Sequence, residues 1–205
     1  MVLLRVFLCG VMVAVVLAAG IRPAESEQSS PADKQVAEEF VNVLGDKYHL
    51  PGPDECKAVV LLFVGHDCPI SNGYAPEIAR LCKKYMPEKI AFCVVYADAD
   101  INRDDASKHA KEFGFCCPAI LDPKMVLALK VEATVKPETA VLSPTGELLY
   151  RGRIDDRYVD FGKRREQLTS HELRDALDAV LAAQPVATPR TKAIGCYIDL
   201  PKVGK

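Results

Sequence analysis

The run AVVLLFVGHDCPISN at residues 58–72 decides the fold class. Its first seven residues are all apolar, which is typical of a strand buried on both faces of a sheet. A short turn then leads to Cys68, and a helical pattern follows it with apolar side chains on one stripe. The stripe consists of Tyr74, Ile78, Leu81, Cys82 and Tyr85. We therefore expect a buried strand, a tight connection and an amphipathic helix that begins close to Cys68.

Strands and helices alternate along the rest of the chain. The further strands are expected at residues 89–96, 119–121, 139–142 and 147–150, the last two forming a β-hairpin through the turn at 143–146. Helices are expected at 103–113, 125–131 and after Thr169 or Ser170, either of which would cap the last one. An extra hairpin is expected at 40–44 and 47–50. This alternation predicts an α/β layer fold with a mixed central sheet flanked by helices.

The two ends of the chain differ from this core. Residues 1–24 combine Arg5 with an apolar run and small residues, a pattern typical of a secretory signal peptide. The alternative, a retained membrane anchor, is disfavoured because the run is shorter than the ~20 residues of a spanning helix. We expect a polar leader at 25–38, a single domain at 39–183, and a C-terminal tail at 184–205 that carries Cys196.

The charge balance excludes one class of partner. The chain has 26 basic and 28 acidic residues, and cleavage near Ala24 would remove two of the basic ones, Arg5 and Arg22. No basic stripe is present, so nucleic acid is not an expected partner. The expected location is periplasmic or extracellular, with no stable membrane span after cleavage.

Cys68 is the residue in which we expect the chemistry to reside. At the start of a helix, free N–H groups and the helix dipole stabilise an anion and lower the pKa of a thiol. We expect Cys68 to be exposed and to alkylate faster than Cys82 and Cys93, which we interpret as buried core thiols.

Three features resemble the thioredoxin superfamily, in particular its redoxin branch. Residues 68–71 (CPIS) stand where thioredoxins have Cys-x-x-Cys, Pro76 follows eight positions later, and Pro137 precedes the hairpin where that fold has a cis-proline. The resemblance covers about residues 59–183 and implies a thioredoxin-like fold with a cis Lys136–Pro137 bond. The motifs at 67–72, 150–156 and 191–196 narrow it to exported bacterial redoxins of the alkyl hydroperoxide reductase/thiol-specific antioxidant type.

Two departures bear on what the resemblance implies. Ser71 replaces the second cysteine, so it cannot close a disulfide, although its hydroxyl can hydrogen-bond the thiolate. Leu61 and Gly65 also stand where peroxiredoxins carry their peroxidatic Pro and Thr or Ser. A resolving thiol must therefore come from elsewhere.

The resemblance then predicts a thiol-based oxidoreductase that needs no cofactor and acts on a protein disulfide, a thiol or a peroxide. Cys68 attacks, Ser71 stabilises the thiolate, Pro137 shapes the substrate groove, and Cys196 or an outside thiol resolves the intermediate. Gly195 allows a close backbone approach, and the apolar patch at 194–198 predicts that the tail docks over the start of the Cys68 helix.

Two other functions stay open at this point. Cys68 and Cys196, with His66, could bind or deliver copper or zinc. The chain could also be a redox-inactive thioredoxin-like binding domain.

Further polar and thiol residues have weaker interpretations. The adjacent Cys116 and Cys117 are expected either to be two free thiols or to have one of them paired with another cysteine, for which Cys56 is the candidate. Asp155 and Asp156 are interpreted as a solvated turn with local ion pairs, with acid–base work or cation binding as alternatives. The remaining histidines, which are His49, His109 and His171, are expected on the surface.

Overall fold

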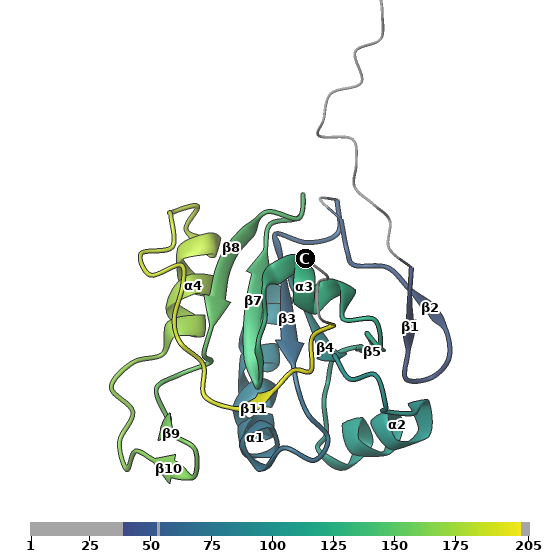
Figure 1. The fold of residues 1–205 in the computed structure, drawn as a ribbon. Coiled ribbons are helices and arrows are strands. Elements are labelled where there is room, and N and C mark those ends of the chain that lie inside the picture. The colour runs from purple at the N-terminus through teal and green to yellow at the C-terminus, as the bar shows by residue number, and fades with distance from the viewer. Residues whose placement is uncertain (1–38, 53, 202–205) are drawn as a thin grey trace, which may run out of the picture. The chain divides into compact units, whose positions relative to one another are not determined.

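The structure is a computed structural model that describes residues 39–52 and 54–201 (Figure 1). The expected signal peptide and leader, residues 1–38, lie outside the described residues. In the part that is described, no helix has the length and apolar character needed to cross a membrane.

The core is a seven-stranded mixed sheet with the order β2-β1-β5-β4-β3-β7-β8. Its strands are β1 (Phe40–Asn42), β2 (Lys47–Tyr48), β3 (Ala58–Phe63), β4 (Ile90–Tyr96), β5 (Ala119–Leu121), β7 (Glu138–Leu142) and β8 (Leu148–Gly152). The central strand β3 is parallel to β4 and antiparallel to β7, and all six of its residues are buried. The apolar run that begins at Ala58 therefore forms the middle of the sheet, as predicted.

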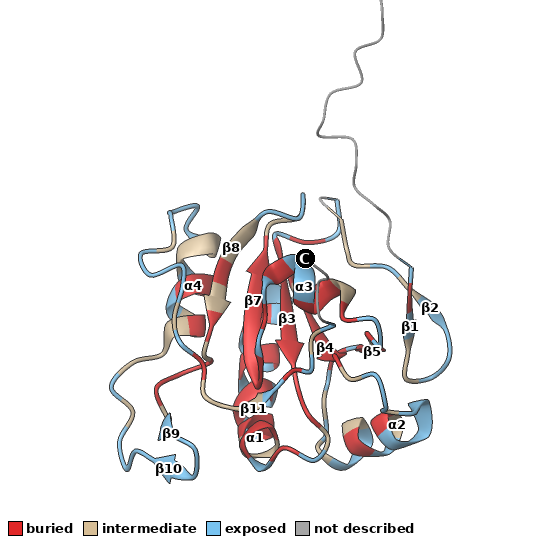
Figure 2. Cartoon of the chain, in the orientation of Figure 1, coloured by how far each residue is buried: buried red, intermediate tan, exposed pale blue. Residues whose placement is uncertain are grey.

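Helices cover the two faces of this sheet. They are α1 (Pro69–Tyr85), α2 (Arg103–Glu112), α3 (Val126–Val131) and α4 (Glu172–Leu181), with a short 3-10 turn η2 (Met86–Glu88) after α1. Apolar side chains of α1 and α4 pack in one cluster with alternate residues of β3, whereas α3 packs in a second cluster with the remaining residues of β3. Figure 2 shows the resulting buried centre, and the fold class agrees with the prediction.

Two pairs of short strands complete the structure. β9 (Tyr158–Asp160) and β10 (Lys163–Arg164) form a small hairpin that the sequence analysis missed. β11 (Cys196–Tyr197) pairs antiparallel with β6 (Val135–Lys136), which lies just before the predicted cis-proline. The C-terminal tail thus returns to the body of the domain, as its apolar patch predicted (Figure 1).

The predicted cap of the last helix is wrong. The N-cap of α4 is His171, without a side-chain cap hydrogen bond. The Thr169 hydroxyl and amide donate to the Asp156 carboxylate instead, and the Ser170 hydroxyl donates to Glu172 Oε1 at 2.8 Å. These residues are engaged by carboxylates, so the helix begins later than predicted.

The interpretation of Asp155 and Asp156 as a solvated turn is also wrong, because both are almost fully buried. Asp155 accepts hydrogen bonds from the Tyr74 hydroxyl at 2.8 Å and from Arg157, and Asp156 forms an ion pair with Arg165 at 3.1 Å. The ion pairs exist, and together with the hydrogen bonds from Tyr74 and Thr169 they tie α1, the segment after β8 and the approach to α4 to one another. Because these partners satisfy both carboxylates in the interior, Asp155 and Asp156 have a structural role.

His109 is a further correction, since it is buried rather than on the surface. Its Nδ1 lies 2.7 Å from the Tyr96 hydroxyl and its Nε2 lies 2.9 Å from Asn72 Oδ1. Burial is the main cause that lowers the pKa of this imidazole. His49 is exposed, as predicted, and His171 is half-buried.

Candidate active site

Cys68 is the N-cap of α1, at the point where the buried strand β3 turns into the helix. Its backbone is extended (φ −88°, ψ 110°), and its carbonyl accepts the first helical hydrogen bond, from Asn72 N at 3.0 Å. The thiol therefore stands at the end of the helix where free N–H groups favour an anion. This is the placement that the sequence predicted.

The loop before β7 faces this thiol. The Lys136–Pro137 peptide bond is cis, as predicted, and the Cys68 thiol donates to the Lys136 carbonyl at 3.1 Å. The Lys136 side chain is buried as well, and its Nζ lies 3.4 Å from Asp98 Oδ2. The sequence did not predict a role for the side chains of Lys136 and Asp98, because they lie far apart in the chain and only the folded structure brings them together.

The tail brings Cys196 to the same place. In the antiparallel pair of β11 with β6, Cys196 is the register partner of Lys136. The tail is held at two further points: Thr191 N donates to the Arg151 carbonyl on β8 at 3.0 Å, and Ile198 N donates to the Thr134 carbonyl at 2.9 Å. The Ile198 side chain is buried in the core cluster that contains α3.

Gly195 is the residue that permits this approach. A Cβ atom at this position would lie 2.2 Å from the Lys136 carbonyl oxygen, 2.6 Å from its carbon and 2.9 Å from Pro137 N. These partners are backbone atoms in a paired segment, so they cannot rotate away as a side chain would. Glycine is required here because the tail backbone rests directly on the cis peptide bond.

The two thiols interact, and the interaction separates their pKa values. Burial alone would raise the pKa of Cys68, but hydrogen bonds outweigh it, chiefly from the Cys196 thiol and from backbone and hydroxyl groups of Ser71, and they lower that pKa. Burial, together with the hydrogen bond to Cys68 and the charge on it, raises the pKa of Cys196 to about 12. Cys68 is therefore the more acidic thiol of the pair, and Cys196 is the one that keeps its proton to higher pH.

Ser71 supports the site from the first turn of α1. Its side chain is buried, and Oγ accepts a hydrogen bond from Gly65 N at 3.1 Å. The hydroxyl also contributes to the lowered pKa of Cys68, which is the role that the sequence suggested for it. Ser71 thereby couples the turn before the helix to the thiol at its start.

One sequence expectation about Cys68 is wrong. The residue is fully buried rather than exposed. The Lys136 carbonyl contacts its sulfur, and the Cys196 thiol on the returning tail lies against it. Because both groups come from segments far away in the chain, the local helix-start pattern could not reveal the cover.

His66 does not join the two thiols. It lines a shallow hollow with Asn72, Lys108, His109 and residues further along α2, and its charge contributes to the lowered pKa of His109. Across residues 39–52 and 54–201, no group of three or more His, Cys, Asp or Glu side chains is arranged to hold a metal ion. The three residues of the expected metal alternative are thus not brought together.

The remaining cysteines are also placed by the structure. Cys93 is fully buried in β4, and Cys82 is buried on the core side of α1, as predicted. Cys56, Cys116 and Cys117 are all free thiols, and Cys56 lies near the Pro51 and Gly52 carbonyls, at 3.7 and 3.6 Å. Cys116 and Cys117 instead interact with Cys82, a contact that no pattern in the sequence predicts.

Several solved structures are similar in fold to this chain. An uncharacterised conserved protein from Geobacillus kaustophilus is 26% identical with a TM-score of 0.67, over 82% of this chain and 92% of that one. A hypothetical protein from Sinorhizobium meliloti is 22% identical with a TM-score of 0.68, over 81% and 93%. The C-terminal domain of a Bacteroides thetaiotaomicron protein named as a thiol-disulfide oxidoreductase is 15% identical with a TM-score of 0.54, over 71% and 92%.

The domain has a thioredoxin-like fold. The sheet order, the cysteine at the N-terminus of α1 and the cis-proline before β7 agree with these structural likenesses. No protein-family model matches the chain, and no curated protein matches it. The thioredoxin-like fold therefore rests on structure, and the chemistry has to be argued from the thiols.

Proposed function

We propose that this protein is an exported thiol oxidoreductase in which Cys68 is the attacking thiol and Cys196 the resolving thiol. The observation that carries the proposal is the contact between these two thiols beside the cis-proline, with the pKa of Cys68 lowered and that of Cys196 raised. A thiolate next to a protonated thiol is the arrangement that thiol–disulfide exchange requires.

The first step is attack on a disulfide R–S–S–R′. The Cys68 thiolate forms a bond to one sulfur of the substrate, and the other sulfur leaves with the electron pair as R′S⁻, which takes up a proton. With a peroxide, the same thiolate attacks the terminal oxygen and the O–O bond breaks, so Cys68 becomes a sulfenic acid and the alkoxide leaves and takes up a proton to give the alcohol. Both routes leave an oxidised sulfur on Cys68 beside Cys196.

The second step uses the raised pKa of Cys196. Two of the largest causes of that raised value, after burial, are the hydrogen bond to Cys68 and the charge on Cys68. Once Cys68 is bonded to substrate sulfur or oxygen, its negative charge is gone and both causes disappear. Cys196 then loses its proton more readily and attacks the Cys68 sulfur, which forms the Cys68–Cys196 disulfide and releases RSH or water.

The surroundings of the pair limit what can reach it. Cys68 is fully buried, and β11 occupies the edge of β6 next to the cis-proline. A hollow of about 790 Å³ opens beside the tail and is lined by Val135, Gly195, Tyr197 and the cations Arg151, Arg190 and Lys192, among others. Neither Cys68 nor Cys196 lines this hollow, so the tail must shift to admit a small disulfide or peroxide, and β11 must lift to admit a protein disulfide.

The proposed location follows from the sequence of residues 1–24 and from the chemistry. An oxidising compartment preserves disulfides, and the signal-peptide pattern predicts delivery to one. Secretion of a fusion of residues 1–38 to a reporter enzyme tests this part separately from the redox activity.

The redox function is tested with the purified chain and a panel of single variants. We expect the parent protein and the control Cys56→Ser to reduce oxidised glutathione or a small peroxide, with mass spectrometry of an unreduced digest joining Cys68 to Cys196. Cys68→Ser should abolish the reduction of the peroxide and the formation of a disulfide at Cys196. Cys196→Ser should accumulate a stable adduct between Cys68 and glutathione. Undiminished peroxide reduction in Cys68→Ser would contradict the role of Cys68, and no reduction by the parent protein would favour a redox-inactive binding domain.

A further inference from the structure

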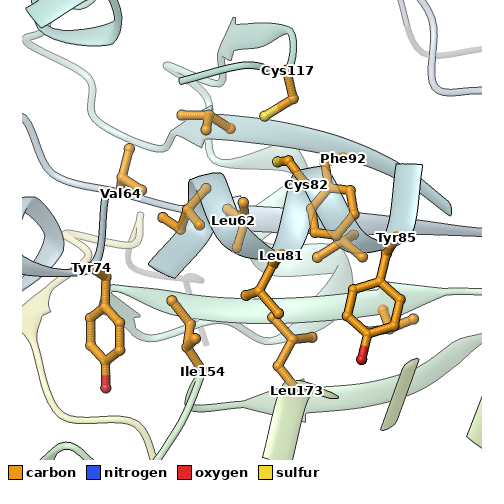
Figure 3. Packing of buried hydrophobic residues seen from close by; sticks show 14 of the residues in the cluster. Leu62, Val64, Tyr74, Leu81, Cys82, Tyr85, Phe92, Cys117, Ile154 and Leu173 are labelled. Carbon is orange, nitrogen blue, oxygen red and sulfur yellow. The ribbon is translucent and has the colours of Figure 1, made fainter. Parts of the chain in front are cut away.

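A second group of thiols lies away from the Cys68 pair. Cys82 comes from the C-terminal half of α1, and Cys116 and Cys117 lie in the turn before β5. In Figure 3 the sulfurs of Cys82 and Cys117 point toward each other from these two elements. Cys82 and Cys117 are buried, whereas Cys116 is exposed. The proposed function uses none of the three.

The backbone fixes the positions of these thiols. Pro118 follows them directly, and its carbonyl accepts a hydrogen bond from Val94 N in β4 at 2.9 Å. On the other side of the turn, Phe115 N donates to the Ala110 carbonyl at the end of α2 at 3.1 Å. The Cys116–Cys117 segment is therefore held between α2 and the sheet, directly against the buried face of α1.

Cys82 is the shared partner within the group. Its thiol interacts with the Cys117 thiol most strongly and with the Cys116 thiol as well. The hydrogen bond with Cys117, followed by burial, raises the pKa of Cys82, and burial with the hydrogen bond to Cys82 raises the pKa of Cys116 to about 11. Adjacent cysteines rarely bond each other because Cα atoms joined by a disulfide prefer a larger separation than neighbouring residues allow.

We propose that Cys82, Cys116 and Cys117 form a second thiol–disulfide site. This site donates two electrons to a low-molecular-weight disulfide and is itself oxidised to a Cys82–Cys117 disulfide. The contacts of Cys82 with both Cys117 and Cys116 favour sulfur–sulfur chemistry within this cluster. The site does not depend on the redox role of Cys68.

The reaction enters at the exposed thiol. Cys116 thiolate attacks the disulfide R–S–S–R, forms Cys116–S–S–R and releases RS⁻, which is protonated to RSH. Cys82 then attacks the Cys116 sulfur and displaces the second RS⁻, which gives a Cys82–Cys116 disulfide. Finally Cys117 attacks the Cys82 sulfur, and Cys116 leaves as a free thiol. In sum, two protein thiols become one disulfide while one R–S–S–R becomes two RSH.

The oxidised site would join the helix that carries Cys68 to the turn before β5. Because α1 holds Cys68 at its N-terminus and Cys82 in its C-terminal half, the two sites lie on one helix. The different pKa values of their thiols distinguish the two sites in an experiment. As long as the pH is below the raised pKa of Cys116, the rate of attack by Cys116 increases about tenfold for each unit by which the pH rises.

The test uses the full chain with Cys68→Ser and Cys196→Ser, so that the first site is silent. This protein is incubated with oxidised glutathione between pH 7 and 9 and digested without reductant. We expect the loss of two free thiols, a peptide that joins Cys82 to Cys117, and a rate that rises about tenfold per pH unit. Cys93→Ala, which removes an equally buried thiol from β4, is the matched control and should change none of these results.

Two further variants identify the order of events. Cys82→Ala should leave a stable glutathione adduct on Cys116, and Cys116→Ser should slow oxidation at least tenfold while the Cys82–Cys117 bond still forms in the end. Circular dichroism of each variant shows that it has folded. Should Cys82 stay a free thiol in the folded parent after Cys116 has become fully glutathionylated, the proposal is overturned, as it is by a rate that does not depend on pH.

Discussion

Substituting alanine for Gly195 tests whether the docked tail makes the Cys68–Cys196 pair. The new Cβ would meet three backbone atoms at 2.2, 2.6 and 2.9 Å, whereas ordinary contacts begin near 3.4 Å. The tail must therefore retreat by more than about 1 Å from the cis peptide bond. Such a displacement is too large for the β11–β6 hydrogen bonds to survive unchanged.

The free energy of docking the tail can be estimated from the contacts of the docked segment. The tail buries Ile198, which contributes roughly 1.5–3 kcal/mol, and makes several backbone hydrogen bonds worth about 0.5–1.5 kcal/mol each. We expect the variant to lose a large part of this sum locally, while the sheet and helices keep their stability. A loss of ~3 kcal/mol would lower the docked population about 100-fold.

The assay measures disulfide formation and the access to Cys68. Gly195→Ala should form the Cys68–Cys196 bond about 10- to 100-fold more slowly, be cut by protease in the tail, and alkylate faster at Cys68 because its cover is gone. Gly52→Ala, where a Cβ meets nothing within 4 Å and the backbone is not left-handed, is the matched control. Formation of the disulfide at the parent rate in Gly195→Ala would refute the reasoning.

The other predictions concern the charges and hydrogen bonds described above. Cys196→Ala removes the hydrogen bond that most lowers the pKa of Cys68, so thiolate absorbance at 240 nm should titrate at a higher pH than in the parent; an unchanged titration would contradict the contact. Ser71→Ala should also raise the pKa of Cys68 and lower stability by about 1 kcal/mol in urea unfolding, because the buried Gly65 N–H loses its acceptor. Burial would raise the pKa of Glu77, but hydrogen bonds from Arg174 and Arg80 lower it, so the unfolded chain binds more protons and stability falls as pH drops from about 4.5 through the folded pKa. Glu77→Gln should therefore lose about 3 kcal/mol at pH 7 and show a flatter dependence of stability on pH below 5, whereas an unaltered pH profile would exclude this role.

Local patterns in the sequence predict a large part of the fold. The seven apolar residues from Ala58 require a strand covered on both sides, and the stripe from Tyr74 to Tyr85 requires a helix on one of them. The return of the tail is also predictable, because an apolar patch around Cys196 has to be buried somewhere. Each of these conclusions depends on residues close together in the chain.

What failed depends on partners from distant segments. Asp155 and Asp156 resemble a solvated turn in the sequence, but Tyr74 and Thr169 from other segments hydrogen-bond them. His109 resembles a surface residue, but it is buried in a hydrogen bond with the Tyr96 hydroxyl. The burial of Cys68 and the contact of Cys82 with the Cys116–Cys117 turn have the same origin. Local sequence patterns predict the helices and strands. The burial and hydrogen bonding of polar side chains depend on tertiary contacts between distant segments, which local patterns do not show.

The separation of the two paired cysteines has a consequence for energetics. A disulfide within Cys-x-x-Cys closes a four-residue loop, whereas Cys68 and Cys196 enclose more than half of the chain. By loop-closure entropy the longer cross-link restrains the unfolded chain by ~5 kcal/mol, about 3 kcal/mol more than a four-residue loop. For the proposed disulfide that difference corresponds to a reduction potential lower by ~60 mV, so its formation would also stabilise the domain against unfolding, and a strong reductant would be needed to reverse it.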